Sequence, residues 1–389
     1  MNDARNLVAL ERDALIAEAK RRTGLSEFGD TWFTVPLDKL IECMHAESNL
    51  SGRGEALWAE RLTTFLENRL IRNQLLKDHP EILDEKVEVS AAILSLGRTG
   101  STKTFRLLAS PPCHTGIKGW EGYFPFPLEG EEPGKPDARR RRSQAIKDAG
   151  PDMEAVFGKT TIETPVEEVF IIEQGFVGTS FECYAWLPTF IEWMKGFDQM
   201  PAYEELRVVL QVLQWQDPSR RGAKWILKSP THMSAPKTLL DAFPNSLIVQ
   251  THRDPLKTMP SHCSMITPLY GIYSDDYDAK AVGRFTCKRW AQMTNDVIDL
   301  REKIGDDHFI DIQYDDLTAD AMGVMRAVFE RMGQVMRPLD EAAMEQWLID
   351  NKRDKWAPHI YDLESHGLSE EIIKSDFARY REKHILNQG

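Results

Sequence analysis

Four short apolar runs, each followed by a segment with helical spacing, constrain the fold of this chain more than any other feature. The runs are VEVSAAILSL (87–96), AKWILK (223–228), SLIVQTH (246–252) and HFIDIQY (308–314). Continuous apolar runs are typical of strands buried on both faces, and alternation of strands with helices is typical of parallel sheets with right-handed crossovers. We therefore expect an α/β fold with a mainly parallel sheet that helices cover on both faces.

Helical and loop segments surround this core and interrupt it once. Residues 1–85 show helical spacing, as in LVALERDALIAEAKRR, so we expect an N-terminal helical region. The α/β core then spans 86–338, with a long helical insertion at 111–222, and a polar helical tail follows at 339–389. Within the insertion, EGEEPGKPDARRRRSQ is rich in proline, glycine and charge, which indicates a surface loop with solvated arginines.

Charge and cysteine content exclude several classes of partner. The chain has 48 basic and 61 acidic residues, a net charge of −13, so we expect no nucleic-acid binding, and any anion site has to be local. The five cysteines show no paired spacing that would indicate a zinc site or a disulfide framework. Charges interrupt the apolar positions of the N-terminal segment and no long apolar stretch follows. We therefore expect no signal peptide, no membrane span and a cytoplasmic location.

The segment ILSLGRTGSTKTFRLLAS (93–110) runs from an apolar strand through a glycine-bearing turn into a helical pattern. Such a turn points backbone N–H groups and the positive end of the helix at one place, which favours a bound anion. The spacing differs from the phosphate loop Gly-x-x-x-x-Gly-Lys-Ser/Thr, because Gly97 and Gly100 are too close and Lys103 follows the hydroxyls. It also differs from the Gly-x-Gly-x-x-Gly dinucleotide turn. Taken alone, the loop is equally well explained by hydroxyl residues that cap a helix.

Cations at the ends of the other apolar runs argue for the anion site. Lys228 closes the second run and Arg253 follows the third, and in a parallel sheet both converge with Arg98 on one edge. Ser261 lies about two helical turns beyond Arg253, where its hydroxyl can share a phosphate with that arginine or cap locally. The HRD triplet at 252–254 is similar to a kinase catalytic loop. The asparagine that such a loop needs five residues later is a methionine here, so we discard that interpretation.

Five motifs occur in a fixed order between residues 87 and 333. They resemble those of sulfotransferases that use 3′-phosphoadenosine-5′-phosphosulfate (PAPS), in particular a bacterial branch with Pro-Arg-Ser-Gly-Thr-Thr, Trp-Glu, Leu-Lys-Ser-Pro-x-His, His-Arg-Asp-Pro and Tyr-Glu-Asp-Leu signatures. In this chain the motifs read GRTGST (97–102), GWEGYFP (119–125), LKSPTH (227–232), THRDP (251–255) and YDDL (314–317). The resemblance implies a parallel sheet like that of P-loop nucleotide kinases.

The resemblance also implies binding roles, residue by residue. Arg253 and Ser261 are expected to bind the 3′-phosphate, with Tyr314 near the adenosine. The loop expected to bind the 5′-phosphosulfate consists of Arg98, Thr99, Gly100, Ser101 and Thr102. Four positions depart from the family pattern: at Thr99 and Ser101 the two hydroxyl residue types are exchanged, which leaves phosphate binding possible, and Gly97 and Lys103 differ more. Gly97 stands where the family has proline, and Lys103, which stands where it has an aliphatic residue, reaches either the donor or solvent.

Sulfuryl transfer is an in-line displacement with a loose transition state, in which positioning and electrostatic stabilisation supply most of the catalysis. Arg98 and Lys228 suit stabilisation of the leaving phosphate oxygen, so we expect no metal. The acceptor hydroxyl needs a general base, and two residues compete for that role. The resemblance implies Glu121, which lies among aromatic residues, and His232 follows Lys228 on the same edge. Each also has a structural interpretation: Glu121 as the ion-pair partner of Arg98 or Lys228, and His232 as a hydrogen-bonding residue at a helix start.

The sequence thus predicts transfer of a sulfuryl group from PAPS to the hydroxyl of a small molecule. The aromatic residues of the insertion favour an apolar or aromatic acceptor over a polysaccharide. They are Trp120, Tyr123, Phe124, Tyr184, Trp186, Phe190 and Trp193. Two other functions stay open: an ATP-dependent phosphotransferase, against which the missing phosphate-loop lysine counts, and a non-catalytic nucleotide-binding protein with this fold. The tail from Leu339 either closes over the donor or packs on a second copy, so the oligomeric state, a homodimer included, stays open.

Overall fold

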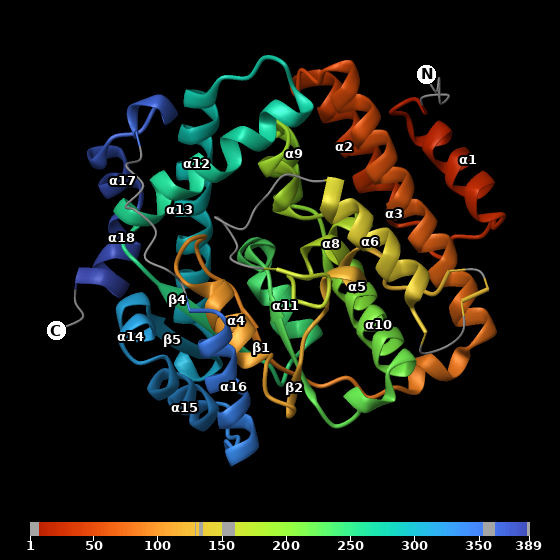
Figure 1. Cartoon of the computed structure of the whole chain (residues 1–389). Coiled ribbons are helices and arrows are strands. Elements are labelled where there is room, and N and C mark those ends of the chain that lie inside the picture. The colour runs from red at the N-terminus through yellow and green to blue at the C-terminus, as the bar shows by residue number, and fades with distance from the viewer. Residues whose placement is uncertain (1–7, 129, 132–134, 150–159, 353–361, 387–389) are drawn as a thin grey trace.

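A five-stranded, all-parallel sheet lies at the centre of the chain (Figure 1). This computed structural model describes residues 8–128, 130–131, 135–149, 160–352 and 362–386. The strands, in the order β2-β3-β1-β4-β5 across the sheet, are β1 Val89–Ile93, β2 His114–Thr115, β3 Lys224–Lys228, β4 Leu247–His252 and β5 Phe309–Gln313. The four apolar runs form β1, β3, β4 and β5, which confirms the predicted α/β fold. The edge strand β2 has two residues, too few to leave a periodic pattern in the sequence.

The register of the sheet places the carboxyl ends of the strands side by side. Ile93 of β1 lies opposite Lys228 of β3, and His252 of β4 lies opposite Gln313 of β5. In parallel sheets this edge is where ligands bind, because the chain leaves each strand there through a loop. The predicted site residues that follow the strand ends are therefore brought to one edge.

Each face of the sheet carries its own hydrophobic core, because successive strand side chains point to opposite faces. On one face Leu227 and Ile248 pack with the N-terminal helices and with the insertion. On the other face Ile93, Ile226 and Val249 pack with the helices α4 (Ser101–Leu108) and α15 (Ala321–Arg331). All five side chains are buried, as expected for strands covered on both sides.

The predicted N-terminal helical region forms three helices, and these share their core with the sheet. Leu15, Leu37 and Trp58, one from each helix, are fully buried and belong to the same cluster as Leu227. The third helix begins at a serine, Ser51, whose side chain accepts a hydrogen bond from the N–H of Gly54. The helices are α1 Arg12–Thr23, α2 Thr34–Glu47 and α3 Gly52–Asp78.

The insertion between β1 and β3 is mostly helical, as predicted. Its helices are α5 Gly119–Tyr123, α6 Asp137–Ala149, α8 Val169–Ile172, α9 Pro188–Met194 and α10 Met200–Gln216, and a 3-10 turn, η3, spans Thr179–Cys183. One expectation about its arginine run was wrong. Arg139 is buried, not solvated: it forms an ion pair with Glu131 at 2.6 Å, and its guanidinium carbon lies 5.0 Å from the ring centroid of Trp120. The aromatic ring and the acid together compensate the burial of that charge.

The remaining helices cover the two faces and the C-terminal side. They are α4 Ser101–Leu108, α11 Pro236–Ala242, α12 Pro255–Tyr273, α13 Ala279–Ile304, α14 Tyr314–Ala319, α15 Ala321–Arg331, α16 Pro338–Asp350, α17 Glu370–Asp376 and α18 Ala378–Arg381. A 3-10 turn, η5, spans Pro230–Ser234, and one π-helical turn, η8, spans Glu382–Leu386. In Figure 1 α17 and α18 lie beside α12 and α13. Within the described ranges, no helix combines the length and the apolar character that crossing a bilayer requires.

Candidate active site

The loop between β1 and α4 bends at two residues whose backbone has a positive φ. Arg98 has φ +69° and Gly100 has φ +92°, both in the left-handed region. A glycine adopts that region without strain, whereas an arginine does so at a cost and is held there by its surroundings. A Cβ at residue 100 would stand 3.2 Å from the ring of Tyr314, so the glycine also permits close packing. The loop then enters α4 at Ser101.

The hydroxyls of this loop do not all face the sheet edge. Thr99 is fully buried, donates to the carbonyl of Leu96 at 2.7 Å and contacts the hydroxyl of Thr251 at 2.6 Å. Its side chain therefore fixes the loop to the end of β4, and only its backbone is available to a ligand. Ser101 is buried at the start of α4 and Thr102 is half-buried beside it. Their N–H groups belong to the first helical turn, which has no intrahelical acceptors for them.

Four predicted donor-binding residues come together at the ends of β1, β4 and β5. Arg98 donates from Nε to the hydroxyl of Ser261 at 3.1 Å. Arg253 donates from Nη1 to the backbone carbonyl of Arg98 at 3.2 Å. Its guanidinium carbon lies 3.9 Å from the ring centroid of Tyr314, a cation–π arrangement. Lys103 faces the same neighbourhood and donates to the carbonyl of Leu317 at 3.0 Å. The structure thus brings two arginines, a serine hydroxyl and an aromatic ring to one place.

Lys228, at the end of β3, is held by two adjacent glutamates from the insertion. Its ammonium forms an ion pair with Glu167, and its backbone N–H donates to Oε2 of Glu168 at 2.9 Å. The other oxygen of Glu168 contacts Nε2 of His232 at 2.5 Å, and Nδ1 of His232 contacts the hydroxyl of Tyr203 at 2.8 Å. A carboxylate only accepts, so Nε2 of His232 donates to Glu168, while Nδ1 and the Tyr203 hydroxyl share the second hydrogen bond. Both ring nitrogens are thereby engaged, and the ring is fully buried.

Glu121 lies at the start of α5 and is buried as well. One carboxylate oxygen accepts from the backbone N–H of Lys118 at 2.8 Å, and the other pairs with Arg220 at 2.5 Å. Its cationic partner is thus neither Arg98 nor Lys228, the two that the sequence suggested. Glu121 and His232, the two expected bases, are both buried, and both carboxylate oxygens of the one and both ring nitrogens of the other contact protein groups.

Glu167 is the acidic residue of the site that sequence reasoning missed. Its side chain is 25% exposed and lies on the ammonium of Lys228, whereas Glu168 beside it is buried. No motif marks Glu167, because it lies in the long insertion, about 60 residues before its partner. The pair of adjacent acids in VEEVF was the only signal, and it does not say which cation they meet.

His262, next to Ser261 on α12, has no hydrogen-bond partner for either ring nitrogen among the described residues. Its ring is buried and packs edge-on against Trp290, with centroids 4.7 Å apart. Burial and the neighbouring charge of Arg98 lower the pKa of His262 to about 4, so the ring is neutral. A Cβ at residue 97 would stand 2.8 Å from Nδ1, which means that Gly97 leaves the space this ring fills.

Comparisons with known proteins agree with this arrangement. The model of a sulfotransferase family matches residues 91–338, more than half of the chain. A 167-residue segment is 26% identical to omega-hydroxy-beta-dihydromenaquinone-9 sulfotransferase Stf3 from Mycobacterium bovis and to that from Mycobacterium tuberculosis, and it covers 41% of this chain and 42% of each relative. The match therefore spans less than half of those relatives' length.

Two solved structures are similar over nearly their whole length. Sulfotransferase STF1 from Mycobacterium tuberculosis H37Rv has a TM-score of 0.83 and 26% identity, over 96% of this chain and 100% of that one. Sulfotransferase STF9 from Mycobacterium avium has a TM-score of 0.87 and 27% identity, over 99% of each chain. Together with the matched family model and the cations gathered at the sheet edge, these similarities lead to one conclusion: the chain belongs to the sulfotransferase family.

Proposed function

We propose that this sulfotransferase moves a sulfuryl group from PAPS to the hydroxyl of an apolar or aromatic small molecule. The observation that supports it best is the group formed by Arg98, Arg253, Ser261 and Tyr314 at one edge of the sheet. Two guanidinium groups and a hydroxyl suit a phosphate, and the tyrosine ring suits stacking against a base. A nucleotide that carries phosphates at both ends of its ribose would use all four residues.

The donor site would divide between the loop and α12. The backbone of Gly100, Ser101 and Thr102 at the start of α4, with Arg98, would hold the 5′-phosphosulfate. Arg253 and Ser261 would hold the 3′-phosphate. The Arg98–Ser261 hydrogen bond supports this division because it brings the two half-sites within reach of each other. Lys228 at the end of the neighbouring strand would meet the phosphate oxygen that leaves.

The reaction follows from the charges at this edge. The acceptor oxygen attacks sulfur, the bond from sulfur to the bridging phosphate oxygen breaks, and 3′-phosphoadenosine-5′-phosphate leaves with that electron pair. Lys228 and Arg98 stabilise the charge that develops on the leaving oxygen, as fixed cations do in phosphoryl transfer. The proton of the acceptor hydroxyl passes to a carboxylate, and we assign this role to Glu167. It is the partly exposed acid beside Lys228, whereas Glu121 and His232 are buried and engaged.

His232 then acts as a positioning residue in this proposal. The chain of hydrogen bonds from Tyr203 through His232 to Glu168 ends on the backbone N–H of Lys228. Buried polar networks whose members are all satisfied make their surroundings rigid. The network fixes the end of β3, and with it the ammonium that the reaction needs.

Aromatic residues of the insertion support an aromatic or apolar acceptor. Tyr123 is 40% exposed, and its ring packs at a tilt against that of Phe170, with centroids 4.7 Å apart. Tyr184 lies 4.6 Å from the guanidinium carbon of Arg61, which pairs with Glu173 at 2.5 Å. Because that ion pair is neutral overall, it suits an uncharged acceptor with an oxygen to receive a hydrogen bond. The mycobacterial relative is named for a hydroxylated dihydromenaquinone, and we propose an acceptor of that general class.

Other aromatic residues that the sequence suggested for this pocket are core residues. Trp120, Phe124 and Phe190 are buried, each with less than a tenth of its side chain exposed. An aromatic stripe in a sequence does not distinguish the two roles, since both require the same residue types.

Calorimetric titration without metal tests the donor. The wild type should bind 3′-phosphoadenosine-5′-phosphate tightly and AMP or ATP weakly. Arg253→Ala should weaken binding of 3′-phosphoadenosine-5′-phosphate at least about tenfold, since hydrogen bonds to charged groups contribute most to the binding free energy. Equal binding of AMP, or a preference for ATP with magnesium, would refute PAPS as the donor.

Initial rates with PAPS and a panel of phenols and prenyl alcohols test the base. Glu167→Gln keeps the size and hydrogen bonding of the side chain but cannot take the proton, and we expect turnover to fall by about 100-fold or more. Glu182→Gln, in a buried acid paired with Arg289, is the matched control for altering an ion pair of the insertion. If Glu121→Gln loses turnover at unchanged stability while Glu167→Gln does not, the assignment of the base is wrong.

A further inference from the structure

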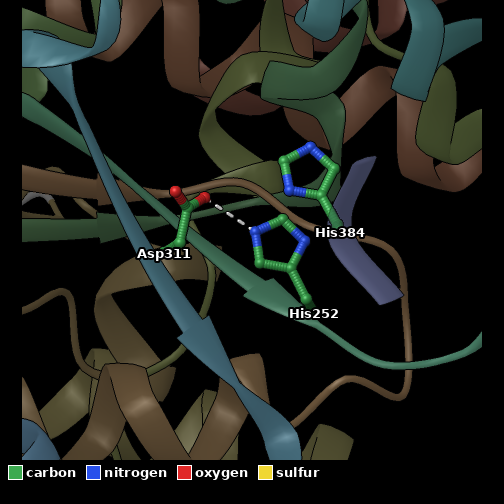
Figure 2. Close-up of side chains that lie close together, drawn as sticks. All are labelled: His252, Asp311 and His384. Atoms are coloured by element: carbon green, nitrogen blue, oxygen red, sulfur yellow. Dashed lines mark hydrogen bonds and ion pairs between the residues drawn. The ribbon is translucent and has the colours of Figure 1, made fainter. Parts of the chain in front are cut away.

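The C-terminal segment 378–386, formed by α18 and η8, binds the ends of β4 and β5. Figure 2 shows His252, the last residue of β4, between Asp311 of β5 and His384 of this segment. Nε2 of His252 lies 2.8 Å from Asp311, and its ring stacks on that of His384 with centroids 4.2 Å apart and an interplanar angle of 6°. All three groups lie within 4.8 Å of one another.

Two histidines and an aspartate at this spacing are also the donor set of a metal site, but the surrounding contacts argue against that interpretation. Arg301 donates to both oxygens of Asp311, at 2.8 and 2.7 Å, so a cation there would face a guanidinium group. Nδ1 of His252 is 3.0 Å from the hydroxyl of Tyr380. The cluster is therefore a hydrogen-bonded chain that joins the C-terminal segment to the sheet.

The contacts of this segment surround Arg253 on both sides along the chain. Tyr380 binds the residue before it, His252, because its hydroxyl lies 3.0 Å from Nδ1 of that ring. Arg381 binds the residue after it, Asp254, at 3.0 and 3.2 Å to the two carboxylate oxygens.

The segment also reaches the aromatic partner of Arg253. Gln313, which directly precedes Tyr314, donates to the carbonyl of His384 at 3.1 Å. Arg253 packs on the Tyr314 ring at 3.9 Å. The same segment thus holds the backbone under the arginine and under the ring.

We propose that residues 378–386 position Arg253 and Tyr314 for the 3′-phosphate and the adenosine, so that the C-terminal segment sets the affinity for 3′-phosphorylated adenine nucleotides. This inference rests on the proposed function. Its physical basis is preorganisation: an arginine whose backbone and stacking partner are already fixed loses less conformational freedom when it binds a phosphate. The segment lies more than 120 residues beyond Arg253 in sequence and meets its neighbours His252 and Asp254 only in the folded chain.

The test compares two ligands on matched variants. Tyr380→Phe removes one hydroxyl and Arg381→Ala removes the ion pair to Asp254. Each should weaken binding of 3′-phosphoadenosine-5′-phosphate about threefold to tenfold, the range expected for loss of one or two hydrogen bonds, and leave AMP binding unchanged. Arg379→Ala is the control, because this neighbouring arginine pairs with Asp299 and Glu302 on α13. Its affinity for both ligands should equal that of the wild type.

A second cycle separates positioning from general destabilisation. In an Arg253→Ala background, Arg381→Ala should cause no further loss of affinity, because the segment acts through Arg253. An equal loss in both backgrounds, or a parallel loss for AMP, would overturn the inference. Thermal melts of each variant with and without ligand identify any that fail to fold, and His384→Gln then serves as a milder replacement. If the wild type itself does not distinguish the two nucleotides, the proposed function fails, not the role of this segment.

Discussion

The contact between Gly97 and His262 makes a prediction whose sign reverses with the background. Gly97 is not among the described glycines with positive φ, so its backbone accepts alanine. A Cβ there would stand 2.8 Å from Nδ1 of His262 and 3.4 Å from its Cε1. The imidazole has little room to retreat, because it is buried and packs on Trp290 at 4.7 Å. Gly97→Ala should therefore overpack the site.

The magnitude follows from two opposing effects. Overpacking a close-packed site costs about 1–3 kcal/mol. Replacing glycine by alanine recovers about 0.4–1 kcal/mol, because the unfolded chain becomes less flexible. Gly97→Ala should lower the free energy of unfolding by about 1–2 kcal/mol in the wild type. His262→Ala removes the clash. In that background Gly97→Ala should raise the free energy of unfolding by about 0.4–1 kcal/mol.

Urea unfolding of the four proteins of this double-mutant cycle measures the coupling, which we expect to be about 2 kcal/mol. Gly52→Ala, where an added Cβ meets nothing within 4 Å, is the matched control and should give the same small change in both backgrounds. If Gly97→Ala costs equally with and without His262, the ring does not occupy the space that the glycine leaves. The presence of glycine where the family has proline would then need a reason other than the room that this ring requires.

Three further predictions concern the sheet edge and the buried charges. Lys228→Ala should lower the turnover number about 100-fold or more in saturating PAPS, and a loss under fivefold would contradict the role of Lys228. The control is Lys237→Ala, in an exposed ion pair, which should leave the turnover number unchanged. Arg69→Met should lower the free energy of unfolding by about 3 kcal/mol, because it strips a buried partner from Glu205, and chemical denaturation measures this. Burial lowers the pKa of His384 to about 3, so the unfolded chain binds the extra proton below its ordinary pKa of about 6.5. Stability should therefore fall by about 2.5 kcal/mol between pH 6.5 and 4.5, and urea midpoints for His384→Phe should fall less; identical curves would refute this.

The sequence predicted the sheet and its cations because both depend on short-range patterns. A strand buried on both faces can be recognised from five or six consecutive apolar residues. A parallel sheet then places the residue that follows each strand at the same edge. These two patterns were enough to predict the positions of Arg98, Lys228 and Arg253 at the sheet edge. Ser261 was expected near Arg253 from helical spacing, and the structure gives its hydroxyl a contact with Arg98.

Such short-range patterns do not predict the hydrogen-bond and ion-pair partners of Glu121 and His232. Glu121 and His232 were expected to meet substrate, yet their partners, Arg220 and Glu168, lie far away in the sequence or on another element. Thr99 shows the same limit over a shorter distance. The motif predicts a hydroxyl at this position, but the left-handed turn at Arg98 decides that it points to Thr251.

Two adjacent glutamates show why the insertion matters for the site and does not only cover it. Glu167 lies on the ammonium of Lys228 with part of its side chain exposed, and Glu168, buried, holds the backbone N–H of the same lysine. Neighbouring residues thus hold one lysine, Glu167 by its ammonium and Glu168 by its backbone N–H. The sheet alone would place Lys228 at its edge and leave the charge unpaired in a half-buried setting, which is costly. The insertion supplies the compensating charge as a partly exposed carboxylate. In the proposed mechanism this carboxylate also takes the proton of the incoming hydroxyl, so one contact would both stabilise the lysine and supply the base. On that proposal, exchange of residues 167 and 168 for glutamine should impair both functions together.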